Sequence, residues 1–149
     1  MATIRLPPDF KDFLKLLHST NVEYLLVGGY AVGYHGYPRA TGDMDIWIAC
    51  TPANAVKVVS VLKQFGFAES AISTELFLKK DQVIRMGLPP LRIELLTSIS
   101  GVSFADCYAH RTIDEVDGVQ VHVISLSHLK INKKAAGRLK DLSDLEHLP

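Results

Sequence analysis

The chain has 149 residues, of which 48% are apolar and 21% are charged, and sixteen basic residues balance sixteen acidic ones. This length and composition predict one folded domain spanning residues 1–149 and exclude a chain that is disordered over most of its length. A net charge of zero excludes an overall field that would hold nucleic acid non-specifically, so any phosphate recognition must be local.

The first half of the chain predicts three helices and two strands. Apolar residues recur at helical spacing from Asp9 to His18. The run "VEYLLVGG" (22–29) has the composition of a buried strand ended by two glycines, and "YAVGYHG" (30–36) can form a short helix. "DMDIWIA" (43–49) predicts the second strand. The helix over 53–65 is preceded by a capping threonine and a proline of the first turn.

The second half mixes strands and helices as well. The predicted segments are strands in "QVIRMG" (82–87) and "LRIELLT" (91–97) joined by a turn at 87–90, a short helix over 103–109, a strand in "VQVHVIS" (119–125), and one or two helices over 125–148 interrupted near Gly137. At least one hairpin lies among them. The sequence therefore predicts an α+β fold in which helices flank a single mixed β-sheet.

The ends and the cysteines carry no targeting or metal signal. The start "MATIRLPPDFKDF" lacks a basic segment followed by a long apolar stretch, and no run of about 20 apolar residues occurs elsewhere. We therefore expect a cytoplasmic protein without a membrane partner. Cys50 and Cys107 are far apart and form no zinc-binding pattern, which is typical of reduced cysteines packed as small apolar residues.

Two aspartates stand at the start of the second strand. Because side chains alternate along a strand, Asp43 and Asp45 point to the same face, about 6 to 7 Å apart. Like charges in that position repel each other unless water or a cation compensates. Mg²⁺ is suited to this, because it is usually held by one or two carboxylates together with substrate phosphates. Alternatively, Asp43 caps the preceding turn and Asp45 faces solvent.

A third carboxylate lies inside a later apolar strand. If the strand of Glu94 lies beside "DMDIWIA", Glu94 meets both aspartates, and three carboxylates can bridge two Mg²⁺ ions about 3.5 to 4 Å apart. The alternative is an ion pair of Glu94 with Arg92 or with Arg85 across the hairpin.

A glycine pair follows the first strand. Gly28 and Gly29 form a strand-to-helix turn without side chains, where a phosphate can approach the backbone N–H groups. The pattern matches neither a Walker A loop nor a dinucleotide-binding fingerprint. Taken alone, it is more typical of an ordinary turn.

Together these motifs resemble the DNA polymerase beta-like nucleotidyltransferase superfamily. The residues that carry the resemblance are "LVGGYAVGYHGYPRATGDMDIWI" and "RIELL", in which thirteen residues separate Gly29 from Asp43. The resemblance implies a nucleotidyltransferase fold, with triphosphate on the glycine turn. It implies Asp43, Asp45 and Glu94 as catalytic residues and as ligands of two Mg²⁺ ions, with Mn²⁺ as a substitute. Glu94 would also orient or deprotonate the attacking hydroxyl.

The segments "HGYPRAT", "RIELLTSISGVSF" and "NKKAAGRLKDLSDLEHL" are similar to the small bacterial AbiEii-like branch, which is associated with toxin–antitoxin systems. That similarity implies a cognate toxin or antitoxin protein as a partner. The chain departs from the superfamily pattern at Gly29, where a serine is common, and at Gly42, where a basic residue is common.

Basic side chains should offset the triphosphate charge. By the same resemblance the candidates are Arg39, Lys133, Lys134 and Arg138. In a helix that continues through Gly137, Lys134 and Arg138 share one face with Asp141, and Lys133 lies near Asp144. An ordinary solvated helix face explains the same pattern.

The sequence thus predicts a metal-dependent nucleotidyltransferase that moves a nucleoside monophosphate from a nucleoside triphosphate to a hydroxyl of RNA, protein or a small molecule. A non-catalytic nucleotide-binding or partner-binding module of a toxin–antitoxin system is the alternative. A glycosyltransferase with an Asp-x-Asp site ranks lower, because 149 residues leave little room for separate donor and acceptor regions. His35 lies near the predicted cleft and either touches substrate or caps the short helix.

Overall fold

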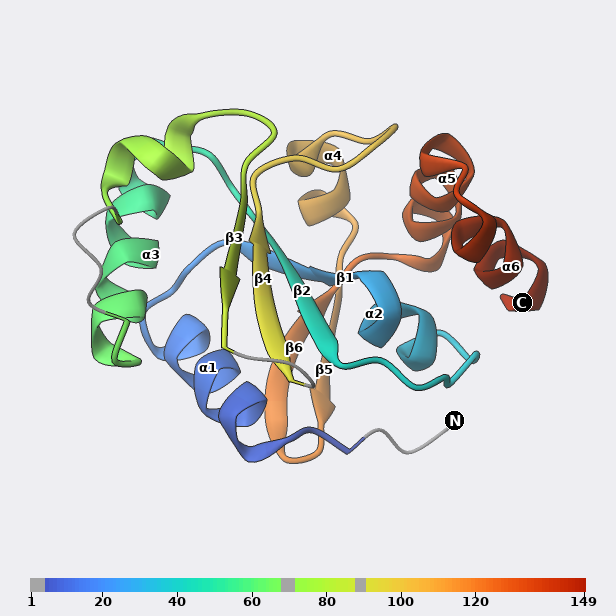
Figure 1. Ribbon diagram of the computed structural model, residues 1–149, viewed down its shortest axis with the longest axis horizontal. Coiled ribbons are helices and arrows are strands. Elements are labelled where there is room, and N and C mark those ends of the chain that lie inside the picture. The colour runs from blue at the N-terminus through green and yellow to red at the C-terminus, as the bar shows by residue number, and fades with distance from the viewer. Residues whose placement is uncertain (1–4, 68–71, 88–90) are drawn as a thin grey trace.

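The computed structural model describes residues 5–67, 72–87 and 91–149 and contains a six-stranded mixed sheet. The strand order is β3-β4-β2-β1-β6-β5. The pairs β2–β4 and β1–β6 are parallel, and the other three pairs are antiparallel. Helices α1 and α3 lie to one side of the sheet in Figure 1, and α2, α5 and α6 lie to the other. The predicted α+β class with a single mixed sheet is confirmed.

The elements follow the chain in this order: α1 (Pro8–Ser19), β1 (Tyr24–Val27), α2 (Gly28–Tyr34), β2 (Asp43–Ile48), α3 (Pro52–Gln64), the 3₁₀ helix η1 (Thr74–Leu78), β3 (Val83–Met86), β4 (Arg92–Leu96), α4 (Phe104–Ala109), β5 (Thr112–Val116), β6 (Val119–Val123), α5 (Leu126–Ala136) and α6 (Leu139–His147).

Alternation along β2 and β4 places core residues on one face of the sheet and the carboxylates on the other. Met44, Ile46 and Ile48 of β2 are fully buried, and so is Leu95 of the neighbouring strand β4. The residues between them point to the opposite face of the sheet. The carboxylates noted in the sequence therefore lie on the face opposite to these four residues, and the buried Trp47 lies on the carboxylate face.

Most predicted elements are present close to their expected bounds. The hydroxyl of Thr51 accepts a hydrogen bond from the N–H of Asn54, and Pro52 is the first residue of α3, as the capping pattern predicts. The predicted turn at 87–90 falls largely on residues 88–90, outside the described residues. The strand β5 and the helix η1 were not predicted.

The predicted interruption near Gly137 is confirmed, and the face that Lys134, Arg138 and Asp141 would share in a continuous helix does not form. Helix α5 ends at Ala136, Gly137 adopts a left-handed conformation with φ of 67°, and α6 begins at Leu139. A left-handed residue after the last helical turn ends a helix, and glycine adopts it without steric cost. Residues 126–147 therefore form two helices in an α5–α6 hairpin, and charges on the two helices meet across it.

Within the described residues, no helix combines the length and the apolar character needed to cross a membrane.

Candidate functional site

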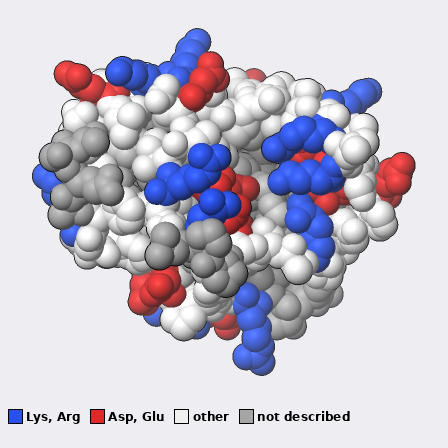
Figure 2. All heavy atoms as spheres, viewed as in Figure 1, with Lys and Arg blue, Asp and Glu red and all other residues white. Residues whose placement is uncertain are grey.

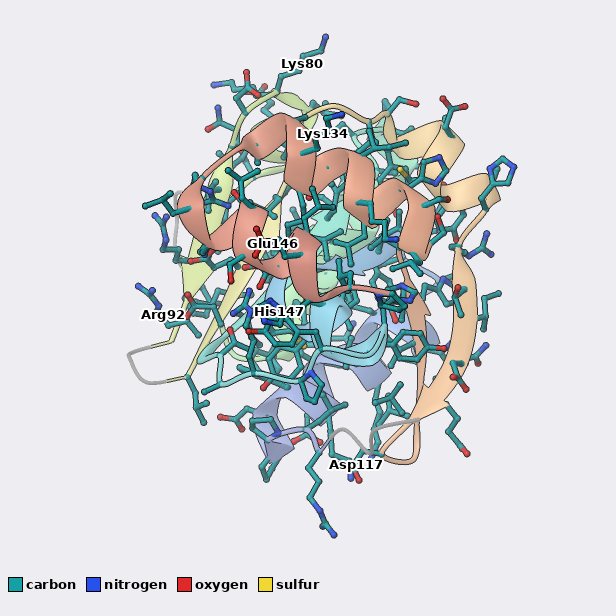
Figure 3. All side chains as sticks on the ribbon, turned by 90° about the vertical axis from the view of Figure 1, so that its right-hand side faces the viewer. Lys80, Arg92, Asp117, Lys134, Glu146 and His147 are labelled. Atoms are coloured by element: carbon teal, nitrogen blue, oxygen red, sulfur yellow. The ribbon has the colours of Figure 1, made fainter. Side chains whose placement is uncertain are left out.

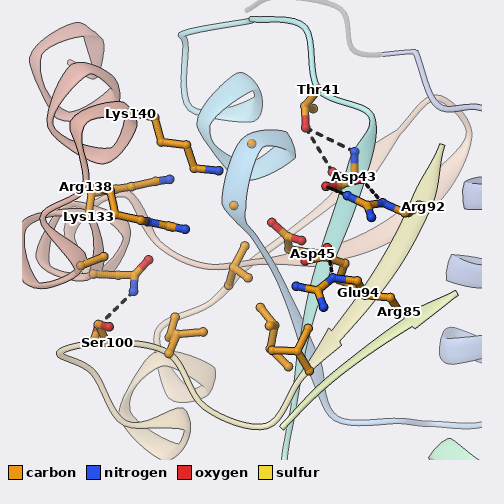
Figure 4. A pocket seen from close by; sticks show the side chains of 18 of the residues that line it. Thr41, Asp43, Asp45, Arg85, Arg92, Glu94, Ser100, Lys133, Arg138 and Lys140 are labelled. Carbon is orange, nitrogen blue, oxygen red and sulfur yellow. Dashed lines mark hydrogen bonds and ion pairs between the residues drawn. The ribbon is translucent and has the colours of Figure 1, made fainter. Parts of the chain in front are cut away.

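The parallel pairing of β2 with β4 brings the three predicted carboxylates together. Asp45 lies directly opposite Glu94, and Asp43 lies opposite Arg92, one step of the same face away. All three carboxylates line a pocket of about 560 Å³ between the sheet and the α5–α6 hairpin, called the central pocket below (Figure 4). This volume is within the range of small-molecule sites, about 300 to 1,000 Å³.

Asp45 lies in an unfavourable environment for a charged carboxylate. Its Oδ1 atom is buried and is the only buried side-chain oxygen or nitrogen of the described residues that lacks a hydrogen-bond partner. Burial, and then the charges of Glu94 and Asp43, raise the pKa of Asp45 to about 7 from its ordinary value of 3.8. A buried polar atom without a partner is costly, so this oxygen is suited to accept a ligand.

The glycine turn lies against Asp45. At Gly28, which has φ of 67°, an added Cβ would lie 2.1 Å from Oδ2 of Asp45. At Gly29, an added Cβ would lie 3.1 Å from the hydroxyl of Thr41, which also lines the central pocket. Neither position accepts a side chain without movement. The hydroxyl of Thr41 therefore lies close to where a serine side chain at position 29 would extend.

Two arginines pair with the outer carboxylates. The guanidinium of Arg92 donates to both oxygens of Asp43, at 3.1 and 3.2 Å, and Nε of Arg85 donates to Oε1 of Glu94 at 3.0 Å. The alternative pairing of Glu94 with Arg85 is thus present. Arg92 pairs with Asp43 because the register of β2 with β4 places the two residues side by side. Among the described residues, no three side chains of metal-ligand type are arranged to hold a metal ion.

The opposite wall of the central pocket is basic. Arg39, Lys133, Arg138 and Lys140 line it, and Figure 4 shows the last three directed from the hairpin toward the carboxylates. Figure 2 shows two groups of basic side chains on this face, one over β3 and β4 and one over α5 and α6, with acidic side chains between them. Lys134, by contrast, is exposed on α5 and is not among the lining residues (Figure 3).

Behind the basic wall lies a buried ion network. Nζ of Lys133 is 3.1 Å from both Oδ1 of Asp141 and Oδ2 of Asp144, and all three side chains are at most 4% exposed. Arg39 donates two hydrogen bonds to Asp144, at 2.7 and 2.8 Å. Burial opposes the ionisation of Asp144, but the hydrogen bonds from Arg39 and Lys133 outweigh it and lower its pKa. The network ties α5, α6 and the loop before β2 together.

Some residues that the sequence predicts to bind nucleotide form ion pairs or hydrogen bonds within the protein. Lys140, a basic residue of the pocket lining, was not predicted. Lys133 and Arg39 contact the central pocket, but both are engaged in the ion network. Nε2 of His35 is 2.7 Å from the carbonyl oxygen of Ile124, which favours the structural role. Lys140 was not predicted to contribute, because its orientation depends on where α6 begins after Gly137.

Two of the three carboxylates are placed to hold a divalent cation. The unpartnered oxygen of Asp45 and the adjacent Glu94 provide the hard oxygen ligands that Mg²⁺ prefers. Asp43 would join them only after Arg92 releases it. Since Mg²⁺ is commonly held by one or two carboxylates and substrate phosphates, the donor set is compatible with such an ion.

The fold is shared with solved nucleotidyltransferase-like structures. A proposed nucleotidyltransferase from Thermotoga maritima superimposes with a TM-score of 0.61 and 15% sequence identity, covering 92% of this chain and 88% of the other. An antigenic nucleotidyltransferase-like protein from Paracoccidioides brasiliensis gives a TM-score of 0.55 and 19% identity, covering 93% and 72%. No protein-family model and no curated protein sequence matches the chain. The comparisons establish a nucleotidyltransferase-like fold, and the AbiEii-like branch stays a prediction.

Proposed function

We propose that this chain is a metal-dependent nucleotidyltransferase that transfers a nucleoside monophosphate from a nucleoside triphosphate to a hydroxyl acceptor. The observation that carries the proposal is the register of β2 with β4, which brings Asp43, Asp45 and Glu94 to one face beside the glycine turn. The nucleotidyltransferase-like fold supports the same activity.

Each wall of the central pocket has a separate role in this proposal. The basic wall, with Arg138 and Lys140, offsets the charge of the triphosphate, which lies along the turn of Gly28. The acceptor oxygen attacks the α-phosphorus, the bond to the pyrophosphate oxygen breaks, and pyrophosphate leaves. Glu94 accepts the proton of the attacking hydroxyl, since it lies within the carboxylate group on the sheet.

Mg²⁺, or Mn²⁺ in its place, would be held by Asp45 and Glu94 and by Asp43 once Arg92 turns away, and when bound it neutralises charge that develops on the phosphate oxygens. A second ion would share the same carboxylates. We further propose that residues 1–149 act as one cytoplasmic domain of the AbiEii-like branch. RNA, protein or a small molecule is the acceptor, and a cognate toxin or antitoxin protein is the partner.

The direct test is transfer of label from each α-labelled nucleoside triphosphate, with Mg²⁺, to total cellular RNA or protein. Asp43→Asn and Asp45→Asn should each abolish transfer. Glu146→Gln, an exposed change on α6 outside the central pocket, should leave it intact. Loss of transfer in the Glu146 variant as well, or transfer that survives both aspartate changes, would contradict the assignment of the site.

The arginine pairs favour a second candidate, a non-catalytic nucleotide-binding or partner-binding module. Arg92 and Arg85 already satisfy oxygens of Asp43 and Glu94 without a metal ion. Such a module would bind nucleoside triphosphate tightly but would transfer no label to any acceptor, with or without Mg²⁺.

A further inference from the structure

The carboxylate face of the sheet becomes apolar two residues further along. Strand β4 pairs with β3 so that Glu94 lies opposite Arg85 and Leu96 lies opposite Val83. Because alternate residues share a face, Val83 and Leu96 continue the surface that carries the ion pair, about 7 Å away. Both residues line the central pocket together with Ile99.

This apolar end is open to the pocket. Val83 is 45% exposed, and Leu96 and Ile99 are only partly buried. An exposed apolar surface that continues directly from a charged site matches a ligand with a charged end and a flat apolar end. A nucleoside triphosphate has that distribution, with the base at the end opposite to the triphosphate.

The wall opposite the sheet also changes from charged to uncharged residues along the pocket. Lys140 and Arg138 lie at the end of the pocket near Thr41, whereas Ser100 marks the other end (Figure 4). Nδ2 of Asn132, on α5, donates a hydrogen bond of 2.9 Å to the carbonyl oxygen of Ser100. Ala136, one helical turn further, lines the same wall.

The hydrogen bond to Ser100 fixes the orientation of the Asn132 amide. A flipped amide would place its oxygen against a carbonyl oxygen and lose the bond. Oδ1 of Asn132 forms no hydrogen bond within the described part of the chain, so it remains available as an acceptor. A fixed acceptor in the lining of the same pocket favours a ligand with an N–H donor at the position that faces it over a ligand with a carbonyl oxygen there.

On the basis of the proposed function, we propose that Val83, Leu96 and Ile99 hold the base of the nucleoside triphosphate and that Oδ1 of Asn132 selects bases with an exocyclic amino group. Cytosine and uracil provide the sharpest comparison. They have nearly the same shape, but cytosine carries an amino group where uracil carries a carbonyl oxygen. The subsite should accept cytidine triphosphate (CTP) and disfavour uridine triphosphate (UTP).

The test is calorimetric binding of CTP, UTP and inorganic triphosphate in Mg²⁺ without an acceptor. The wild-type chain should bind CTP at least about tenfold more tightly than UTP, since bound uracil would cover Oδ1 of Asn132 with a carbonyl oxygen, and an acceptor that binding buries without a partner costs that much or more. Asn132→Leu should bring the CTP-to-UTP affinity ratio close to one. Ile99→Ala should weaken both nucleotides, each by about fivefold, with the ratio preserved. Neither variant should change the affinity for inorganic triphosphate.

The three ligands separate failure of this inference from failure of the proposed function. Equal affinity of the wild-type chain for CTP and UTP would overturn the role of Asn132. Nucleotides that bind no more tightly than inorganic triphosphate would overturn the base subsite, while leaving the phosphate site in place. If none of the three ligands binds, both the subsite and the proposed function are wrong.

Discussion

At the scale of single residues, the position of the Asp45 side chain requires a glycine at position 28. The aspartate is partly buried, its buried Oδ1 has no partner among the described residues, and the glycine leaves the space that its other oxygen occupies. A buried carboxylate oxygen without a partner is costly in a folded protein, so Asp45 opposes stability unless a ligand binds there. The chain thus maintains an unfavourable group in the central pocket, as functional sites commonly do.

This cost predicts a pH dependence of stability. The pKa of Asp45 is raised to about 7 in the folded chain, chiefly by burial and by Glu94, with Asp43 adding to it and Lys140 opposing it. Between about pH 4 and pH 7 the folded chain therefore holds a proton that the unfolded chain has lost, and stability falls as pH rises through this range. The loss amounts to at most about 4 kcal/mol, and to less because water reaches the pocket.

The measurement is urea unfolding at pH 5 to 8 without divalent cations, followed by the fluorescence of Trp47, the single tryptophan. Asp45→Asn should be more stable than the wild-type chain at pH 8, by about 1 to 3 kcal/mol, and should lose this advantage at pH 5. Burial lowers the pKa values of His35 and His122, which acts in the opposite direction. Because both proteins contain these histidines, the difference between them isolates Asp45. A difference that does not vary with pH would contradict the argument.

At the scale of elements, the α5–α6 hairpin determines which basic side chains face the central pocket and can contact a ligand there. The break at Gly137 turns α6 back so that Lys133 contacts Asp141 and Asp144. These buried groups hold the hairpin together. Arg138 and Lys140 lie at the start of α6 and line the central pocket, whereas Lys134 is exposed and does not line it.

This arrangement predicts that two lysines of the same hairpin differ in their effect on phosphate binding. Lys140→Gln should weaken the binding of inorganic triphosphate by about 10- to 100-fold, since a hydrogen bond to a charged group contributes about 1.5 to 3 kcal/mol. Lys134→Gln removes the same charge from an exposed site of α5 and should change the affinity less than about twofold. Isothermal titration calorimetry of both variants provides the comparison. Equal losses would mean that the general charge of the hairpin, rather than the central pocket, attracts the phosphate.

At the scale of the whole molecule, the sequence predicted the fold class, most elements and the common face of the two aspartates. The spacing of Asp43 and Asp45 fixes their common face through the geometry of any strand. That Glu94 would join them was conditional on β4 lying beside β2, a long-range property that local sequence patterns do not determine. The sequence left the partner of each arginine open, because one register places Arg92 opposite Asp43 and another does not. Strand β5 was missed because "TIDEV" combines apolar alternation with two acids that disfavour strands.

The distribution of charge over the molecule is uneven although its net charge is zero. Six basic side chains line the central pocket with three carboxylates: Arg39, Arg85, Arg92, Lys133, Arg138, Lys140, Asp43, Asp45 and Glu94. A concave site with an excess of one charge focuses its field on small ligands of the opposite charge. A long duplex cannot enter such a pocket and meets a surface that is neutral on average.

Ionic strength should therefore separate local phosphate binding from general attraction to polyanions. The screening length falls from about 10 Å at 0.1 M salt to about 3 Å at 1 M, so the affinity for Mg²⁺-bound nucleoside triphosphate should fall at least about tenfold over this range. A nucleoside without phosphates should lose no affinity. Duplex DNA should not bind measurably even at 0.1 M salt, because a chain of zero net charge provides no overall positive field to hold its backbone. Tight, salt-sensitive binding of duplex DNA in a fluorescence anisotropy titration would show that the protein attracts polyanions beyond the central pocket.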